Sequence, residues 1–212
     1  MPTRSPGREA LPLSEARNNF TRAFVLLVIR SPTCIEDSVR HRETRIPARC
    51  VVSFGKCAIV FIMNIAGYEF IYICNIEPVR ADDGSVQHFM PQARYQNAHR
   101  HALHRYGSGP FCKFKIPSRI PSCGVYALAV AGEILYVGEC ENLMKRFNYQ
   151  YGNISPRNCF KNGRETNCRL NSLIYSKVQQ GKHISLYFFQ TSNYKSVESS
   201  LRSTLKPAWN LI

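Results

Sequence analysis

The chain has 212 residues, and hydrophobic side chains make up 44% of them, which is enough apolar material for a buried core. Lys and Arg number 28 against 14 Asp and Glu, so the formal net charge is +14. These values argue against a disordered chain and favour a globular protein with a polyanionic partner, such as nucleic acid or an acidic membrane surface. The alternative is a basic structural or interaction protein with no nucleic-acid role.

The nine cysteines are an odd number, and no two of them have Cys-x-x-Cys spacing. We therefore expect reduced thiols in a cytoplasmic protein rather than a disulfide framework. Cys159 and Cys168 flank a loop, so a zinc site completed by outside partners is an open alternative. The start of the chain contains Arg, Glu and Asn instead of an apolar core, which argues against a signal peptide.

The first elements in chain order are weakly marked. Residues 1–13 combine Pro, Arg and Gly without periodicity, and we expect a disordered lead-in. Ser14 could cap a helix over residues 15–29, although the apolar end of that segment fits a strand as well.

An apolar run at residues 57–76 is the one stretch with membrane-like composition. Polar side chains interrupt it within a length that barely spans a bilayer, so no membrane contact is expected. Two buried strands at 58–64 and 68–74, turning at Ala66-Gly67, explain the run better.

Residues 87–106 interleave cations with rings, a composition that can lie along a phosphate backbone and stack bases. The residues concerned are Arg94, Arg100, Arg105, His88, His99, His101, His104, Tyr95 and Tyr106. A solvated segment without function is the alternative. The Gly- and Pro-containing segment 106–110 is the expected boundary, so that residues 14–110 form an N-terminal mixed α/β extension with a possible role in DNA contact or dimerisation.

The second half, residues 111–212, predicts six elements in the order β-β-α-α-β-α. They are strands 125–130 and 134–137, helices 141–149 and 169–179, strand 184–190 and helix 195–205. This order predicts an α+β fold with a small antiparallel three-stranded sheet flanked by helices. The first two strands are joined by a loop whose length favours a hairpin, and the hairpin places Tyr126 and Tyr136 side by side.

The residues that follow the tyrosine pair suit phosphodiester hydrolysis, which needs an attacking water, a proton acceptor and positive charge near phosphorus. A phenol has an unperturbed pKa of about 10, and the nearby cations Lys145 and Arg146 would lower it. Arg146 could also fork onto phosphate oxygens. Glu198 could hold a hard divalent cation through its carboxylate oxygens.

The motifs Gly124-Val125-Tyr126 and Tyr136-Val137-Gly138 resemble those that name the GIY-YIG nucleases. Arg146, ten residues after Tyr136, matches the helix arginine of that family, and the segment 197–210 resembles its last motif, a glutamate followed twelve residues later by asparagine. The resemblance covers residues 111–212.

This resemblance implies an endonuclease with one Mg²⁺ or Mn²⁺ ion that leaves 5′-phosphate and 3′-hydroxyl ends. Tyr126 would act as base on the attacking water, with Tyr136 assisting. Arg146 would stabilise the phosphorane, Glu198 would bind the metal, and Asn210 would orient the site by hydrogen bonds.

The sequence departs from the family one helical turn after the arginine, where many relatives have His or Tyr. Position 150 is Gln here, with Tyr149 and Tyr151 on either side, and the sequence does not decide between them. Polar and basic residues near the predicted site are expected to contact DNA, double-stranded by preference. They are Lys145, Tyr149, Tyr151, Arg157, Arg164, Asn167 and Arg169.

The sequence therefore predicts a metal-dependent DNA endonuclease, with compact size favouring a restriction-like role by analogy. The alternative, motivated by Gln150, is a nucleic-acid-binding module whose nuclease fold no longer cuts. The oligomeric state stays open, with a dimer as one option.

Overall fold

The computed structural model of the chain describes residues 60–117 and 122–211. The lead-in expected at 1–13 and the helix expected at 15–29 lie outside the described residues, as does the start of the strand expected at 58–64. Division of the chain at residue 110 stays a prediction.

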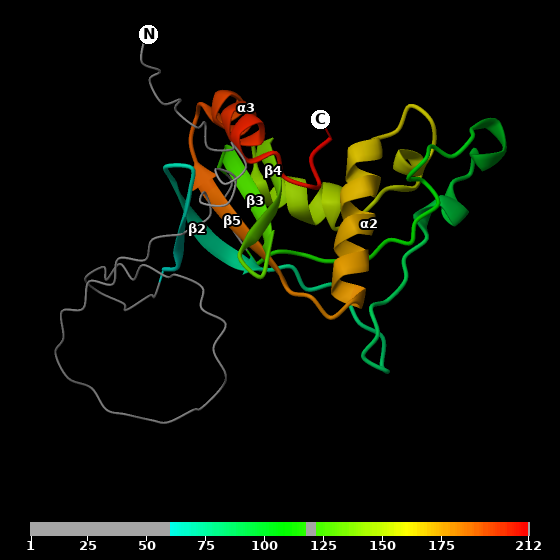
Figure 1. The fold of residues 1–212 in the computed structure, drawn as a ribbon. Coiled ribbons are helices and arrows are strands. Elements are labelled where there is room, and N and C mark those ends of the chain that lie inside the picture. Colours follow the sequence, from blue (N-terminus) through cyan, green and yellow to red (C-terminus); the bar gives the residue numbers. More distant parts are fainter. Residues whose placement is uncertain (1–59, 118–121, 212) are drawn as a thin grey trace, which may run out of the picture.

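The described part of the chain has an α+β fold built on one antiparallel sheet (Figure 1). Its strands lie in the order β1-β2-β5-β3-β4. They are β1 (Ile62–Ile65), β2 (Tyr68–Asn75), β3 (Gly124–Val130), β4 (Glu133–Cys140) and β5 (Ile184–Gln190).

The prediction of a three-stranded sheet is therefore wrong, because the sheet has five strands. Strands β3, β4 and β5 pair as expected, but β2 pairs with the other edge of β5 and β1 pairs with β2. An uncovered β5 edge would present unpaired N–H and C=O groups. The N-terminal hairpin covers that edge, so both halves of the chain share one sheet.

Two-residue turns close both hairpins. Ala66 and Gly67 connect β1 to β2 with φ of 48° and 91°, and Ala131 and Gly132 connect β3 to β4 with φ of 50° and 85°. Two consecutive positive φ values match the hairpin turns whose twist suits adjoining strands. The predicted turn at Ala66-Gly67 and the predicted tyrosine hairpin are confirmed.

Helices cover both faces of the sheet (Figure 1). Helix α3 (Tyr194–Leu205) packs Val197 and Leu201 against one face, beside Val125 and Val137. The other face packs against helix α2 (Glu165–Gln179), the short helix α1 (Leu143–Lys145) and the π-helix η3 (Arg146–Tyr151). The three tyrosines of the candidate site belong to this second core.

The helix expected at 141–149 takes a different form, because only its first turn is α-helical and the remainder, η3, is a π-helix that extends to Tyr151. Helix α2 begins before the expected residue 169 and ends as expected, with Gly181 at φ of 72° beyond it. Helix α3 ends before Pro207, also as expected.

No helix in the described part of the chain is long and apolar enough to cross a membrane. The described portion of the apolar run forms β1 and β2 instead. Cys159 and Cys168 are fully buried, and their thiols donate to the backbone oxygens of Ser155 and Asn158, respectively. Among the described residues, no group of three or more His, Cys, Asp or Glu could hold a metal ion.

Candidate active site

The two motif tyrosines lie on neighbouring strands and face the same core. Tyr126 on β3 and Tyr136 on β4 have ring centroids 6.1 Å apart, with an interplanar angle of 30°. Both are buried, at 1% and 7% exposed. The predicted pairing of the two phenols is therefore what the sheet produces.

The glycines of the two motifs are required by close packing. Gly138 pairs with Tyr126 across the hairpin, and a Cβ at Gly138 would lie 2.5 Å from the Tyr126 hydroxyl oxygen. A Cβ at Gly124 would overlap the Phe189 carbonyl oxygen and lie 2.6 Å from the Phe188 ring. Any larger residue at Gly138 would displace the ring that carries the Tyr126 hydroxyl.

The π-helix brings a third tyrosine to the pair. Tyr151 is 2% exposed, and its hydroxyl oxygen lies 2.7 Å from that of Tyr126. A π-helix closes its turn over five residues, as in the bond from Gly152 N to Phe147 O at 2.7 Å. The residue one turn after Arg146 is therefore Tyr151, whereas Tyr149 is 67% exposed.

Contacts with Asn171 and Phe147 fix Tyr151 in this position. Its backbone oxygen accepts a hydrogen bond from Asn171 Nδ2 at 2.6 Å, in the buried part of helix α2. Its ring packs edge-on against Phe147, with centroids 5.5 Å apart. The choice that the sequence left open between Tyr149 and Tyr151 is thus decided by backbone geometry.

Arg146 lies beside this cluster with donors to spare. Its Nη1 donates to Gln150 Oε1 at 2.8 Å, and its Nη2 donates to the Glu139 backbone oxygen at 3.3 Å. Its guanidinium carbon is 5.7 Å from the centre of the Tyr151 ring. A guanidinium has five N–H donors, so most remain available to a bound anion.

Arg146 stays protonated in this environment. Burial alone lowers the pKa of Arg146, but the neighbouring oxygens of Tyr126, Tyr151 and Glu139 outweigh it and raise that pKa. Gln150 hydrogen-bonds to the guanidinium along η3, and the Tyr151 ring lies beside it.

The expectation that cations lower the tyrosine pKa is wrong for Tyr126 and Tyr151. Burial raises the pKa of Tyr126 well above its usual value, and the neighbouring phenols add to the shift, while the charge of Arg146 only partly opposes it. Burial likewise raises the pKa of Tyr151. Both hydroxyls are neutral at pH 7 and serve as hydrogen-bonding groups, since a phenolate would be poorly solvated there.

Glu198 lies on helix α3, close to a carboxylate that sequence reasoning missed. Burial raises the pKa of Glu198, and the negative charge of Glu139 on β4 adds to this, while Arg202 opposes it. Arg202 Nη1 is 3.3 Å from Glu198 Oε1. Glu139 directly follows the second motif and is three residues after Tyr136 on the same strand. Because successive side chains of a strand point to opposite faces, the sequence could have predicted that Glu139 faces α3 and Tyr136 faces the other core.

This donor set fits a magnesium ion. Mg²⁺ in proteins is usually bound by one or two carboxylates together with water and substrate phosphates. Two neighbouring, partly buried carboxylates also disfavour each other's charge, and a bound cation would relieve that cost. Glu198, with Glu139 beside it, is thus suited to hold a hard divalent ion.

Asn210 secures the open edge of β4. Its Oδ1 accepts from Val137 N at 2.9 Å, and its Nδ2 donates to Val137 O at 2.7 Å. Trp209 N donates to Leu135 O at 2.8 Å, so the chain end continues the sheet by one short step. The predicted orienting role takes a specific form, because Asn210 holds the strand between the two motif residues Tyr136 and Gly138.

Four successive residues of β4 thus assemble the site. Tyr136 supplies one of the phenols, and Val137 hydrogen-bonds to Asn210. Gly138 packs against Tyr126. The backbone oxygen of Glu139 accepts a hydrogen bond from Arg146, and its negative charge raises the pKa of Glu198. Tyr126, Tyr136 and Arg146 lie on one face of the sheet, whereas Glu198 lies on helix α3, which packs against the other face. The five residues predicted to be catalytic are thus linked through β4, and their catalytic roles stay predictions.

The residues predicted to contact DNA fall into two groups. Lys145, Tyr149, Arg157 and Arg164 are exposed or partly exposed, and contact with DNA stays a prediction for them. Tyr151, Asn167 and Arg169 are buried, at 2%, 3% and 8% exposed, and Arg169 Nη2 donates to the Trp209 backbone oxygen. The last group therefore supports the fold in this structure.

Comparison with known proteins gives a partial likeness among solved structures. No protein-family model matches the chain, and no curated protein sequence matches it significantly. Among solved structures, the chain is similar to a point mutant of EndoII from bacteriophage T4. The two share 22% sequence identity with a TM-score of 0.39, over 67% of this chain and 92% of that chain.

Proposed function

We propose that this protein is a metal-dependent DNA endonuclease of the GIY-YIG type that leaves 5′-phosphate and 3′-hydroxyl ends. The observation that carries the proposal is the convergence of Tyr126, Arg146, Glu198 and Asn210 on residues 136–139 of β4. The excess of cations over acids across the chain suits a polyanionic substrate. A restriction-like role is part of the proposal.

In this proposal, Arg146 receives the scissile phosphate. Its free N–H groups stabilise the negative charge that develops on the phosphate oxygens during attack. The hydrogen bonds to Gln150 and to the Glu139 carbonyl fix the guanidinium before substrate arrives. Arg146 therefore needs little reorganisation in the reaction.

Glu198, with Glu139 nearby, would hold Mg²⁺ or Mn²⁺. A divalent cation supplies Lewis-acid stabilisation of charge on phosphate and water when it is bound. The sequence alone suggested one carboxylate, and Glu139 is a second candidate ligand of the same ion.

The tyrosines act as a hydroxyl cluster in this proposal. Tyr126 and Tyr151 share a hydrogen bond of 2.7 Å, and hydrogen bonding to Tyr136 also contributes to the raised pKa of Tyr151. Neutral hydroxyls can orient an attacking water by hydrogen bonds, and the proton that this water loses passes to bulk water. The role predicted for Tyr126, with Tyr136 assisting, is thereby assigned to the three together.

The non-cutting alternative was motivated by Gln150, and the structure supplies a different role for that residue. Gln150 accepts a hydrogen bond from Arg146, while Tyr151 occupies the core position one π-turn after the arginine. No observation now favours the non-cutting alternative over cleavage.

The test is cleavage of supercoiled plasmid with Mg²⁺, with Mn²⁺ and with EDTA. Wild-type protein is expected to nick or linearise DNA only with the metal, and Glu198→Ala and Tyr126→Phe are expected to lower the rate by at least about 100-fold. Glu77→Ala is the matched control, because it removes a carboxylate from an exposed residue outside the site. Robust cutting by either active-site variant would overturn the assignment, and sequencing the cut ends would test the end chemistry and the restriction-like role.

A further inference from the structure

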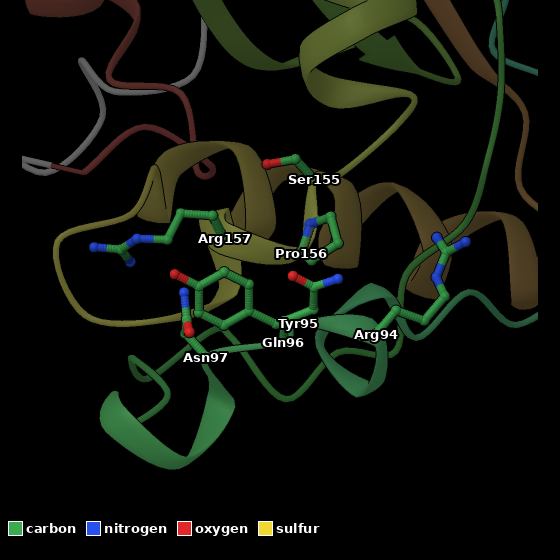
Figure 2. A pocket seen from close by; sticks show the side chains of 7 residues that line it. All are labelled: Arg94, Tyr95, Gln96, Asn97, Ser155, Pro156 and Arg157. Atoms are coloured by element: carbon green, nitrogen blue, oxygen red, sulfur yellow. The ribbon is translucent and has the colours of Figure 1, made fainter.

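A cleft of about 300 Å³ lies outside the active site, between two short 3₁₀ helices. Helix η1 (Pro91–Arg94) and the residues that follow it form one wall, and helix η4 (Pro156–Cys159) forms the other. The polar lining consists of Arg94, Tyr95, Gln96, Asn97, Ser155 and Arg157 (Figure 2).

Hydrogen bonds next to the cleft link the two segments that carry its walls, although the walls are about 60 residues apart in sequence. Lys161 N donates to Ala102 O at 2.9 Å, and His104 N donates to Cys159 O at 3.1 Å. The His104 ring is buried, and its Nε2 lies 2.7 Å from the Asn158 backbone oxygen. The cleft is therefore a built feature rather than a chance gap between loops.

The segments that carry the walls of the cleft are rich in cations. Residues 84–117 contain five Lys or Arg and no Asp or Glu, and residues 142–164 contain another five and no Asp or Glu. Among the described residues, neither Arg94 nor Arg157 pairs with a carboxylate. The cleft is thus suited to an anionic ligand.

The lining has the chemistry of a nucleic-acid strand. Figure 2 shows the guanidinium groups of Arg94 and Arg157 at opposite ends, with the Tyr95 ring between them. The Tyr95 ring is braced on Phe160, with centroids 4.8 Å apart. Arginines bind phosphates, exposed amides such as that of Asn97 suit base edges, and a fixed aromatic ring offers a stacking surface.

The cleft also lies within reach of the active site along the chain. Ser155 is four residues after Tyr151, so their Cα atoms are at most about 14 Å apart. Base pairs in duplex DNA are about 3.4 Å apart along the axis, so this span is about four base-pair steps. One bound strand can therefore occupy both sites.

We propose that this cleft binds the backbone of the cleaved DNA strand a few nucleotides from the scissile bond. Arg94 and Arg157 contact separate phosphates, and Gln96 and Asn97 face a base edge. The proposal rests on the proposed endonuclease function and adds a substrate-binding site remote from the reacting atoms.

The test measures DNA binding separately from cleavage. In a Glu198→Ala background, a short DNA duplex is titrated at several salt concentrations for the parent, for Arg94→Ala/Arg157→Ala and for Arg80→Ala/Lys182→Ala. The last pair removes the same charge from exposed residues outside the cleft. An RNA duplex of the same sequence is titrated in parallel.

Loss of two phosphate contacts is expected to reduce the slope of log Kobs against log salt by about 1.8. The control pair should leave that slope unchanged, and Gln96→Ala/Asn97→Ala should alter the distribution of cut sites in the cleaving protein. A slope equal to that of the control pair would overturn the cleft proposal, as would a reduced slope on RNA only. These outcomes are independent of the proposed function, which fails if wild-type protein with Mg²⁺ does not cut plasmid.

Discussion

Tyr151→Phe removes one hydroxyl from the tyrosine cluster and keeps the ring. The Tyr126 hydroxyl would lose the partner at 2.7 Å while its residue remains 1% exposed, so water cannot readily replace that partner. A buried polar group left without a hydrogen bond costs about 1–3 kcal/mol. In a chain of this size, the loss corresponds to a fall of roughly 2–12 °C in Tm.

The chain contains a well-placed probe for this measurement. Trp209 is its one tryptophan, is 6% exposed and belongs to the same buried cluster as Tyr151. Urea unfolding followed by tryptophan fluorescence therefore reports on the core that the mutation changes. Tyr149→Phe, at a side chain that is 67% exposed, should change the free energy of unfolding by no more than about 0.5 kcal/mol.

A double-mutant cycle separates the hydrogen bond from the loss of two hydroxyls. Tyr126→Phe/Tyr151→Phe leaves no orphaned partner within that pair, so it should destabilise less than the two single changes added together. Cleavage by Tyr151→Phe should fall about 100-fold, because the attacking water loses its ordered hydroxyl chain. If the two single changes in the free energy of unfolding add up to that of the double variant, the hydrogen bond is refuted. Unchanged cleavage by Tyr151→Phe would refute its catalytic use.

Three further predictions follow from the same contacts. Asn210→Ala should lower the free energy of unfolding by about 1–3 kcal/mol and slow cleavage, because both Val137 backbone groups lose a partner. Circular dichroism in urea measures the stability and the plasmid assay measures cleavage. An unchanged free energy of unfolding would contradict this prediction. Glu198→Gln should abolish cleavage without lowering Tm at pH 7. Burial raises the pKa of Glu198, so its ionised form is less favourable in the folded chain. The stabilisation available to the protonated form is lost as pH rises through that pKa. A lower Tm by calorimetry would count against this environment. Because the pKa values of Tyr126 and Tyr151 are raised, the contribution of these two phenols to the free energy of unfolding should be constant up to about pH 10. Above that pH it should fall by up to about 1.4 kcal/mol per pH unit for each phenol. Urea titrations at pH 9 to 11 should show a shallower fall for the double Phe variant, and equal slopes would contradict the shifts.

The fold was predictable where local rules decide it. The Ala-Gly turns and the end of α3 before Pro207 follow from residue chemistry within a few positions. The five-stranded sheet was not predictable in this way, because the pairing of β2 with β5 joins segments more than 100 residues apart. Two strands were expected at the N-terminal hairpin, but nothing in their own sequence says which edge they cover.

The site was predictable in its residues and less so in their state. The resemblance of the motifs pointed to Tyr126, Arg146, Glu198 and Asn210, but it assumed an α-helical turn after Arg146. The π-helix adds one residue to that turn and thereby selects Tyr151. The direction of the phenol pKa shifts depends on burial by side chains from several elements, which spacing does not report.

The formal charges around β4 explain why such a site would need a divalent ion. Arg146 and Arg202 contribute two positive charges, and Glu139 and Glu198 contribute two negative charges, so the protein groups balance. A phosphodiester brings one negative charge, and an attacking hydroxide would bring another. Because the buried phenols resist ionisation, neither they nor the protein cations can absorb this excess. In the proposed reaction, a divalent cation beside Glu198 would restore neutrality, whereas a monovalent ion would leave one charge uncompensated in a partly buried site, where charge is costly.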